Sequence, residues 1–280
     1  MNINQWNAWD FGGVRQVTGF NINGHSQFKN LWNAGFFLGM DSELISNSTL
    51  RGGPSMTMPA EINANLGFST NERKELSFDM GGFLSRGFEE SSGQNGLEME
   101  LTYKPISNLS VSLDPEFGTR WSQLQYVDQQ EVGSEERYIF GSIDQKTFSL
   151  SLRIDLILTP DMTIQFWGQP FIASGAYSDF KYITDSHADR FVDRFHLYTD
   201  QEISYNETFE NYQVTETGSG LEYDFANPDF NLKEFLSNLV FRWEYNLGST
   251  LYLVWAHDRS GWEGTYNPAT DIVGDLFGMK

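Results

Sequence analysis

The sequence of 280 residues contains no cysteine, which excludes disulfide scaffolds, cysteine-ligated zinc, iron–sulfur clusters and thiol nucleophiles. Basic residues are scarce, because 18 Lys and Arg stand against 38 Asp and Glu and leave a net charge of -20. Binding to the phosphate backbone of a nucleic acid needs clustered basic side chains. The composition therefore predicts no nucleic-acid partner.

Long apolar runs are also lacking, since no stretch approaches the roughly 18 residues that a membrane-spanning helix requires. The first eleven positions, Met1 to Phe11, show neither the basic nor the apolar region of a signal peptide. What the chain does contain is 15% aromatic residues and 26 Gly. This composition is typical of many all-β chains.

Apolar and polar side chains alternate with a period of two, which is the pattern of a strand with two different faces. The clearest example lies within Arg137 to Thr159, where Phe148 to Leu158 presents apolar side chains at every second position. This segment reads as one strand of about 20 residues, against the ~5–6 usual in globular sheets. Shorter alternating segments occur at residues 62–68, 76–80, 97–103, 109–113 and 239–245.

Short turns and long polar connections are predicted to alternate between these strands. The short turns fall at residues 23–26, 70–74, 105–108, 159–161 and 246–249, and the long connections at 41–55, 85–95, 118–136, 174–229 and from 259 onward. Outer-membrane barrels have short turns at one end, long loops at the other and girdles of aromatic residues at the membrane interfaces. Phe68, Tyr103 and Tyr245 would form such a girdle. The pattern favours an antiparallel up-and-down transmembrane β-barrel, with about ten or eleven strands visible.

Several segments resemble a family of Gram-negative outer-membrane proteins. The family joins an amino-terminal domain similar to family-9 carbohydrate-binding modules to a carboxy-terminal barrel domain of unknown function. The resemblance implies an outer-membrane location and covers nearly the whole chain. The segments that carry it are Asn23 to Trp32, Leu50 to Pro54, Leu101 to Pro105, Leu124 to Val127, Gly168 to Gly175 and Ser237 to Tyr245.

Two departures from the family pattern bear on the domain organisation. Nothing here resembles the sugar-binding domain, and the sequence stops at Gly278-Met279-Lys280 instead of finishing with a strand that ends in aromatic residues. The resemblance therefore implies that residues 1–280 are a single β-barrel domain and a fragment of a longer protein. We expect the amino-terminal part of the barrel, the sugar-binding domain and the last strand to be missing.

In a barrel, the polar side chains of the alternating segments would face the lumen. An arginine facing lipid near the membrane midplane would cost about 2–4 kcal/mol. An acidic majority in the lumen favours cations or neutral polar solutes over anions. The candidates for lining the lumen are Glu98, Glu100, Arg153, Asp155, Trp167, Arg242 and Glu244.

The remaining chemistry of the sequence is sparse. Asp185, Asp189 and Asp193 recur at every fourth residue, so a short helix would align three carboxylates as a weak candidate for a metal site. Solvated charges in a loop are the alternative reading. No nucleophile elbow, Walker or dinucleotide motif is present, and the sequence predicts neither an enzyme nor a bound cofactor.

These patterns, together with the resemblance, predict a non-enzymatic outer-membrane barrel that binds or passes carbohydrate or other polar nutrients. The transport part rests on the resemblance alone. Expected partners are outer-membrane lipid, carbohydrate and other envelope proteins. Two alternatives stay open: a structural or assembly component with a plugged lumen, and a soluble all-β binding protein.

Overall fold

The structure is a computed structural model, and its described residues are 1–264. It is built almost entirely of strands, with two short 3-10 turns, η1 (Phe88–Glu90) and η2 (Phe191–Asp193). The strands are β1 (Asn2–Trp9), β2 (Arg15–Gln27), β3 (Asn33–Asp41), β4 (Leu44–Ser46), β5 (Met56–Met58), β6 (Glu61–Ser69), β7 (Leu76–Gly87), β8 (Ser92–Ile106), β9 (Leu109–Val132), β10 (Glu135–Thr159), β11 (Met162–Ile183), β12 (Phe195–Leu197), β13 (Ile203–Asn206), β14 (Asn211–Thr215), β15 (Glu222–Ala226), β16 (Phe230–Asn246) and β17 (Ser249–Glu263).

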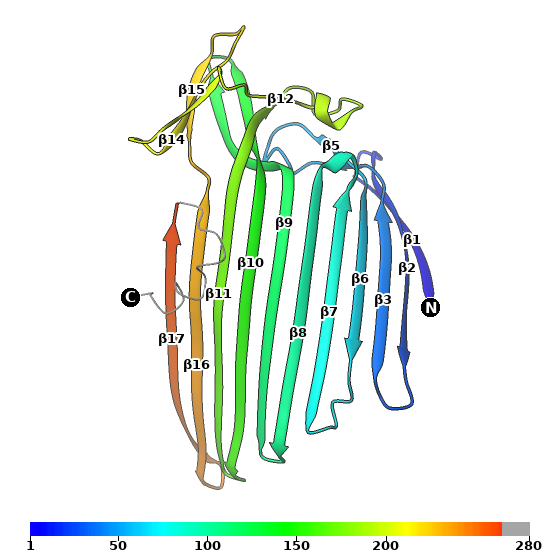
Figure 1. Ribbon diagram of the computed structural model, residues 1–280, viewed down its shortest axis with the longest axis vertical. Helices are drawn as coiled ribbons and strands as arrows, with labels where there is room; N and C mark the ends of the chain where they lie inside the picture. Colours follow the sequence, from blue (N-terminus) through cyan, green and yellow to red (C-terminus); the bar gives the residue numbers. More distant parts are fainter. Residues whose placement is uncertain (265–280) are drawn as a thin grey trace.

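One 12-stranded antiparallel sheet dominates the fold, with its strands ordered β1-β2-β3-β6-β7-β8-β9-β10-β11-β16-β17 and β12 paired to the end of β11 (Figure 1). Strands that follow one another in this sheet are neighbours, which confirms the predicted up-and-down order. The sheet is open and does not close into a barrel: β1 and β17 form its two edges in the described part of the chain. Among residues 1–264, no helix is long and apolar enough to cross a membrane.

Long strands explain the height of the sheet. β10 has 25 residues, β9 has 24 and β11 has 22, so the prediction of one continuous strand through Arg137 to Thr159 is confirmed. Short connections join the strands at the lower end in Figure 1, including Pro160-Asp161 and Leu247-Gly248. Gly248 has a φ of 76°, a backbone angle that suits glycine in a two-residue hairpin turn.

The predicted turn at residues 23–26 is wrong. β2 continues through this segment to Gln27, and the chain reverses at residues 28–32, where the Phe28 amide donates to the Trp32 carbonyl. Gly24 pairs with Phe36 on β3, and a Cβ on Gly24 would lie 2.9 Å from the Phe36 ring. The glycine therefore makes room for an aromatic ring within a strand and does not form a turn.

Two of the long connections predicted from sequence, residues 85–95 and 118–136, are largely strand, and the two at 174–229 and from 259 onward begin as strand. Between β7 and β8 only residues 88–91 are connection, and β9 and β10 meet at the two-residue turn Gly133-Ser134. β11 extends to Ile183 before its long connection begins, and β17 extends from Arg259 to Glu263; residues 265–280 lie outside the described part. These strand ends mix polar and apolar residues on each face, so pairing continues where the clear alternation stops.

The long connections at the upper end, residues 42–60 and 184–229, pack on the upper parts of β9, β10 and β11. We call these two connections the cap. Two buried clusters hold the cap, and the neighbouring residues Ile139 and Phe140 of β10 point into different ones. The first contains Leu50, Met56, Leu124, Tyr138, Phe140 and Phe191, and the second contains Ile139, Phe180, Tyr198, Val214 and Phe225.

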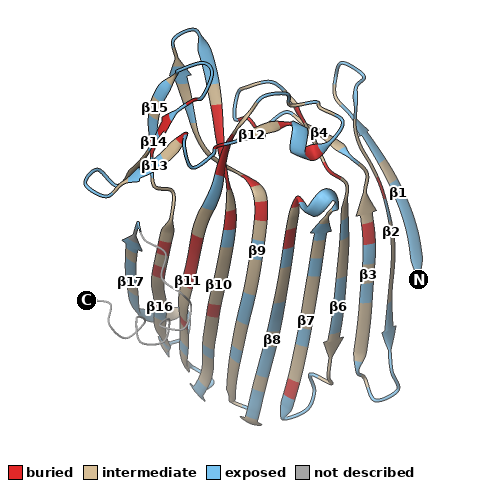
Figure 2. Ribbon diagram, turned by 45° about the horizontal axis from the view of Figure 1, so that its top comes forward, coloured by how far each residue is buried: buried red, intermediate tan, exposed pale blue. Residues whose placement is uncertain are grey.

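Register shifts in β10 accompany this change of packing. They occur between Phe140 and Ser142 against β11, and between Gly141 and Ile143 against β9. A bulge of this kind bends a strand and redirects its side chains. Below the shifts the sheet is a single layer, whereas above them both of its faces are covered (Figure 2).

We predict that Phe140→Ala destabilises the cap by about 3–5 kcal/mol, because it leaves a cavity in a cluster where this side chain is fully buried. Hydrogen exchange of the cap amides measures the effect. Phe209→Ala is the matched control: this ring is 72% exposed, so a change within about 0.5 kcal/mol is expected. Equal effects of the two substitutions would contradict the assignment of the core.

Candidate functional site

One face of the sheet carries a continuous belt of apolar side chains. Across seven strands, from β7 to β17, neighbours in register are Leu76, Tyr103, Val111, Ile154, Phe166, Leu239 and Trp255. Such cross-strand neighbours lie about 4.5–5.5 Å apart at Cβ, so they form one surface. We call the face that this row shares with Phe148 to Leu158 the belt face.

The belt face is not covered by a second layer within residues 1–264. Leu66 is 69% exposed, Trp255 is 59% exposed and Phe117 is 48% exposed. Monomeric soluble proteins rarely expose contiguous apolar patches larger than a few hundred Å². A row of this length therefore indicates a surface that meets an apolar medium or partner.

The opposite face is polar, and the structure places all seven candidates for lining a lumen on it. Arg153 pairs with Trp167, Asp155 pairs with Gln165, and the Gln165 amide donates to Asp155 at 3.1 Å. Arg242 donates to Glu244 at 3.0 Å on the same face. Glu98 is opposite Glu116, and Glu116 is opposite Ser149, so these three side chains are on the same face. Glu100 is two residues further along β8 and therefore shares the face of Glu98. We call this side of the sheet the polar face.

A depression of about 610 Å³ lies on the polar face and is lined by carboxylates from three adjacent strands. Two of the predicted residues, Glu98 and Glu100, belong to it; Arg153, Asp155, Trp167, Arg242 and Glu244 do not line it. Its carboxylates are Asp79, Glu98, Glu100, Asp114 and Glu116. The arrangement offers many hydrogen-bond acceptors and a negative potential to a solute at this surface.

Three carboxylates of the depression were missed by the sequence analysis. Asp79 lies on the polar side of an alternating segment, as the predicted residues do, so its position in the strand was sufficient to include it among the candidates. Asp114 and Glu116 flank Pro115, and a proline is normally a signal against a strand interior. Here β9 continues through Pro115, which is opposite Leu150.

The weak metal candidates are not brought together. Asp185 accepts a hydrogen bond from the His187 amide, and Asp193 pairs with Arg190 at 3.2 Å. Residues 184–190 form bends and a turn, not the helix that would have aligned Asp185, Asp189 and Asp193. Within the described part of the chain, no cluster of three or more His, Asp or Glu side chains has the geometry to hold a metal ion.

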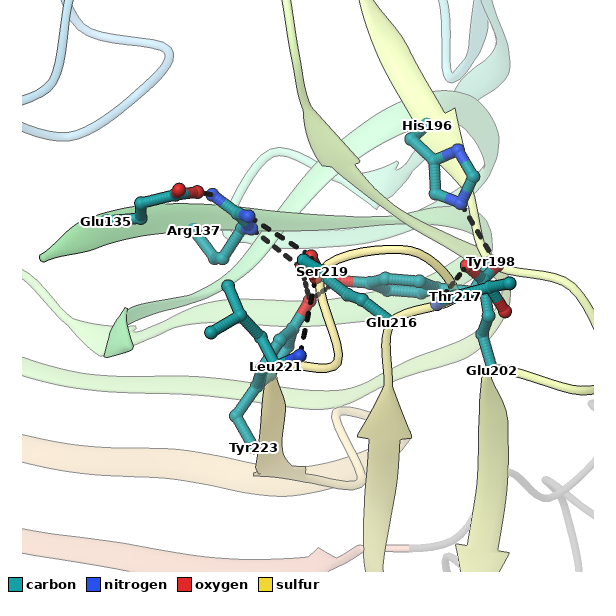
Figure 3. A network of polar contacts seen from close by, with 10 residues as sticks. All are labelled: Glu135, Arg137, His196, Tyr198, Glu202, Glu216, Thr217, Ser219, Leu221 and Tyr223. Carbon is teal, nitrogen blue, oxygen red and sulfur yellow. Dashed lines mark hydrogen bonds and ion pairs between the residues drawn. The ribbon is translucent and has the colours of Figure 1, made fainter. Parts of the chain in front are cut away.

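A buried ionic network joins the cap to the top of the sheet (Figure 3). Arg137 of β10 donates two hydrogen bonds to Glu216, at 2.7 and 3.1 Å, and Glu216 is 4% exposed. Glu216 also accepts from Ser219 at 2.7 Å and Tyr223 at 2.8 Å. Burial alone would raise the pKa of Glu216, but the hydrogen bonds from Arg137 and its other donors lower it.

Glu202 forms the second half of the network. It is 4% exposed and accepts hydrogen bonds from the Thr199 and Thr217 amides, and it contacts the His196 ring at 3.0 Å. Burial favours the neutral acid, yet these bonds stabilise the carboxylate more and lower the pKa of Glu202 to about 2. Both acids are thus held ionised as anchors that fix β13, β14 and β15.

Residues 4–267 match a protein family described as a domain of unknown function, DUF5916. The chain belongs to this family. The match includes the open sheet, the polar face and the cap, so these features together are one DUF5916 domain. A comparison with curated proteins found no match.

We predict that the cap loses stability in acid because of Glu202. A carboxylate whose pKa falls from 4.5 to about 2 on folding stabilises the fold above pH 4.5, and this contribution disappears as the pH falls through about 2. Hydrogen exchange of β13 to β15 between pH 6 and pH 2.5 measures the loss.

Glu202→Gln should weaken this pH dependence and leave the part that Glu216 contributes, and Glu222→Gln, at an exposed position of β15, should leave it intact. A Glu202→Gln protein with the same acid sensitivity as the unmodified chain would show that another group is responsible.

Proposed function

We propose that this DUF5916 domain forms much of the wall of an outer-membrane β-barrel that binds or passes carbohydrate or other polar nutrients. The uncovered belt face carries the proposal. Hydrocarbon has no hydrogen-bonding capacity, so only structures whose backbone groups are paired internally cross it, and paired strands with an apolar outer face meet this requirement.

The dimensions of the belt fit a membrane. A tilted strand crosses the hydrocarbon layer with about 9–11 residues. Counted from the turn at Pro160-Asp161, this span covers β11 as far as Ile172, whose neighbour in β10 is Phe148. Above that level lie the register shifts and the cap. The short turns would therefore lie in the periplasm and the cap outside the cell, as in other barrels of this type.

Closure of the barrel places a condition on the remaining wall. Each neighbouring pair from β1 to β17 is antiparallel, so the two edge strands run in the same direction. Direct pairing of β17 with β1 would be parallel, whereas barrels of this kind are antiparallel throughout. The proposal thus requires an odd number of additional strands, from outside the described residues, between these two edges.

The polar face supports the nutrient part of the proposal. Its carboxylates, guanidinium groups and amides can exchange hydrogen bonds with sugar hydroxyl groups, and acidic groups outnumber the basic ones. This charge favours neutral or cationic solutes over anions. The choice of carbohydrate rests on the resemblance to proteins that carry a sugar-binding domain beside the barrel.

Membrane insertion is tested with two neighbouring substitutions on opposite faces. Leu152→Arg places a charge on the belt face near the middle of the span and should destabilise insertion by about 2–4 kcal/mol. Ser151→Arg, beside Asp114 on the polar face, should be tolerated. The measurement is the fraction of the full-length protein recovered in outer membranes and its folding in vesicles. Equal tolerance of both arginines, with the unmodified protein in the soluble fraction, would refute insertion.

Passage of solutes is tested separately with the full-length protein in liposomes. A neutral oligosaccharide should leave these liposomes faster than a sugar acid of similar size. Replacing Glu98 and Glu100 by Gln should reduce that preference, because the lining then repels anions less. Insertion without release of any solute would count against transport and favour a structural role.

A further inference from the structure

A second pocket, of about 710 Å³, lies beside the upper part of β11, at the level of the register shifts. β9, β10, β11 and the cap segment 192–197 form its walls. It is lined by polar and apolar groups together: Trp121, Ser122, Gln123, Ser142, Ile143, Asp144, Ser178, Asp179, Lys181, Val192, Phe195 and Leu197. Pockets that combine apolar walls with a few convergent polar groups are the usual form of small-molecule sites.

Lys181 is the buried charge of this pocket, with only 2% of its surface exposed. Its Nζ donates to the Gln123 carbonyl at 2.8 Å and to the Ser142 hydroxyl at 3.1 Å, and lies 4.9 Å from the centre of the Phe195 ring. An ammonium group has three N–H donors, so two neutral acceptors leave one donor unused. Within the described part of the chain, no carboxylate lies within ion-pair distance of this group.

The other buried cations of the cap region differ from Lys181 in this respect. Arg194, at 1% exposure, pairs with Glu43 at 3.2 Å, and Arg137 pairs with Glu216 at 2.7 Å. A buried charge is costly unless it is paired. Burial lowers the pKa of Lys181 to about 8, although the more distant charge of Asp179 raises it in part.

The other titratable side chains lining the pocket are Asp144 on β10 and Asp179 on β11, and both are exposed. From β9 and the cap come only neutral groups, among them Trp121, Phe195 and Leu197. Two acids at the surface disfavour a ligand with several negative charges. A single negative charge can still reach the buried ammonium group, because the exposed acids are screened by solvent.

We propose that this pocket binds a small molecule with one carboxylate group on an apolar or aromatic body. The carboxylate accepts the third N–H of Lys181 and becomes its missing counter-ion. The body packs among Trp121, Phe195 and the aliphatic side chains of the walls. This inference does not depend on membrane insertion, because the pocket belongs to the described fold in either environment.

Sodium benzoate is the probe, titrated into the detergent-solubilised full chain by calorimetry. Pairing with benzoate raises the pKa of Lys181, so binding at pH 8.5 should take up protons from the buffer. Affinity should be constant from pH 6 to 7.5 and should fall by about tenfold for each pH unit above 8, as expected for one linked proton. Binding with no proton uptake, or no binding at all, would overturn the proposal.

Lys181→Met should abolish benzoate binding, whereas Lys146→Met should not affect it. Lys146 is a matched control because it lies on neighbouring β10 but does not line the pocket. A direct measurement covers the case in which Lys181→Met fails to fold. In the unmodified chain, benzoate should slow acetylation of Lys181 by acetic anhydride, relative to Lys146, as followed by mass spectrometry. Equal rates with and without benzoate would also overturn the proposal.

Discussion

The alignment of apolar side chains across paired strands is the constraint on which the rest of the structure depends. Because side chains alternate along a strand, a shift of one residue in any register would move an apolar set to the opposite face. The observed registers bring Val111, Ile154 and Phe166 side by side. The two faces of a single-layered sheet thereby become chemically opposite, and each can meet a different medium.

The cap is stabilised by different interactions from those of the lower sheet. Above the register shifts in β10, the sheet is covered on both sides, so it has the buried clusters of an ordinary globular domain. Ionised groups are also found there: Glu202 and Glu216 are buried, and each has several donors. The lower wall and the cap are therefore stabilised by separate interactions, and Lys181 lies where the two parts meet.

Much of the wall could be predicted from the sequence, because alternation is a local property. The strand through Phe148 to Leu158 and the common face of Arg153, Asp155 and Arg242 follow from it. The turn prediction at Asn23-Gly24 is wrong because this dipeptide is a usual turn signal. The sequence alone does not show that Gly24 lies in a strand and leaves room for the ring of Phe36. The upper part of β9 was predicted as loop because polar and apolar residues are mixed on each of its faces, although Leu124 packs beneath the cap. Contacts between segments far apart, such as Arg194 with Glu43, leave no local pattern.

The medium that contacts the belt face decides whether this sheet is a membrane wall. Because the chain has no cysteine, single cysteines can be introduced at successive positions from Leu150 to Asp155 and spin-labelled without interference. In native outer membranes, the account predicts strong relaxation by oxygen at Leu150→Cys, Leu152→Cys and Ile154→Cys. Relaxation by a water-soluble nickel complex should dominate at the three odd-numbered positions, 151, 153 and 155. Access of the nickel complex to the even-numbered positions, or the absence of any alternation, would contradict the account.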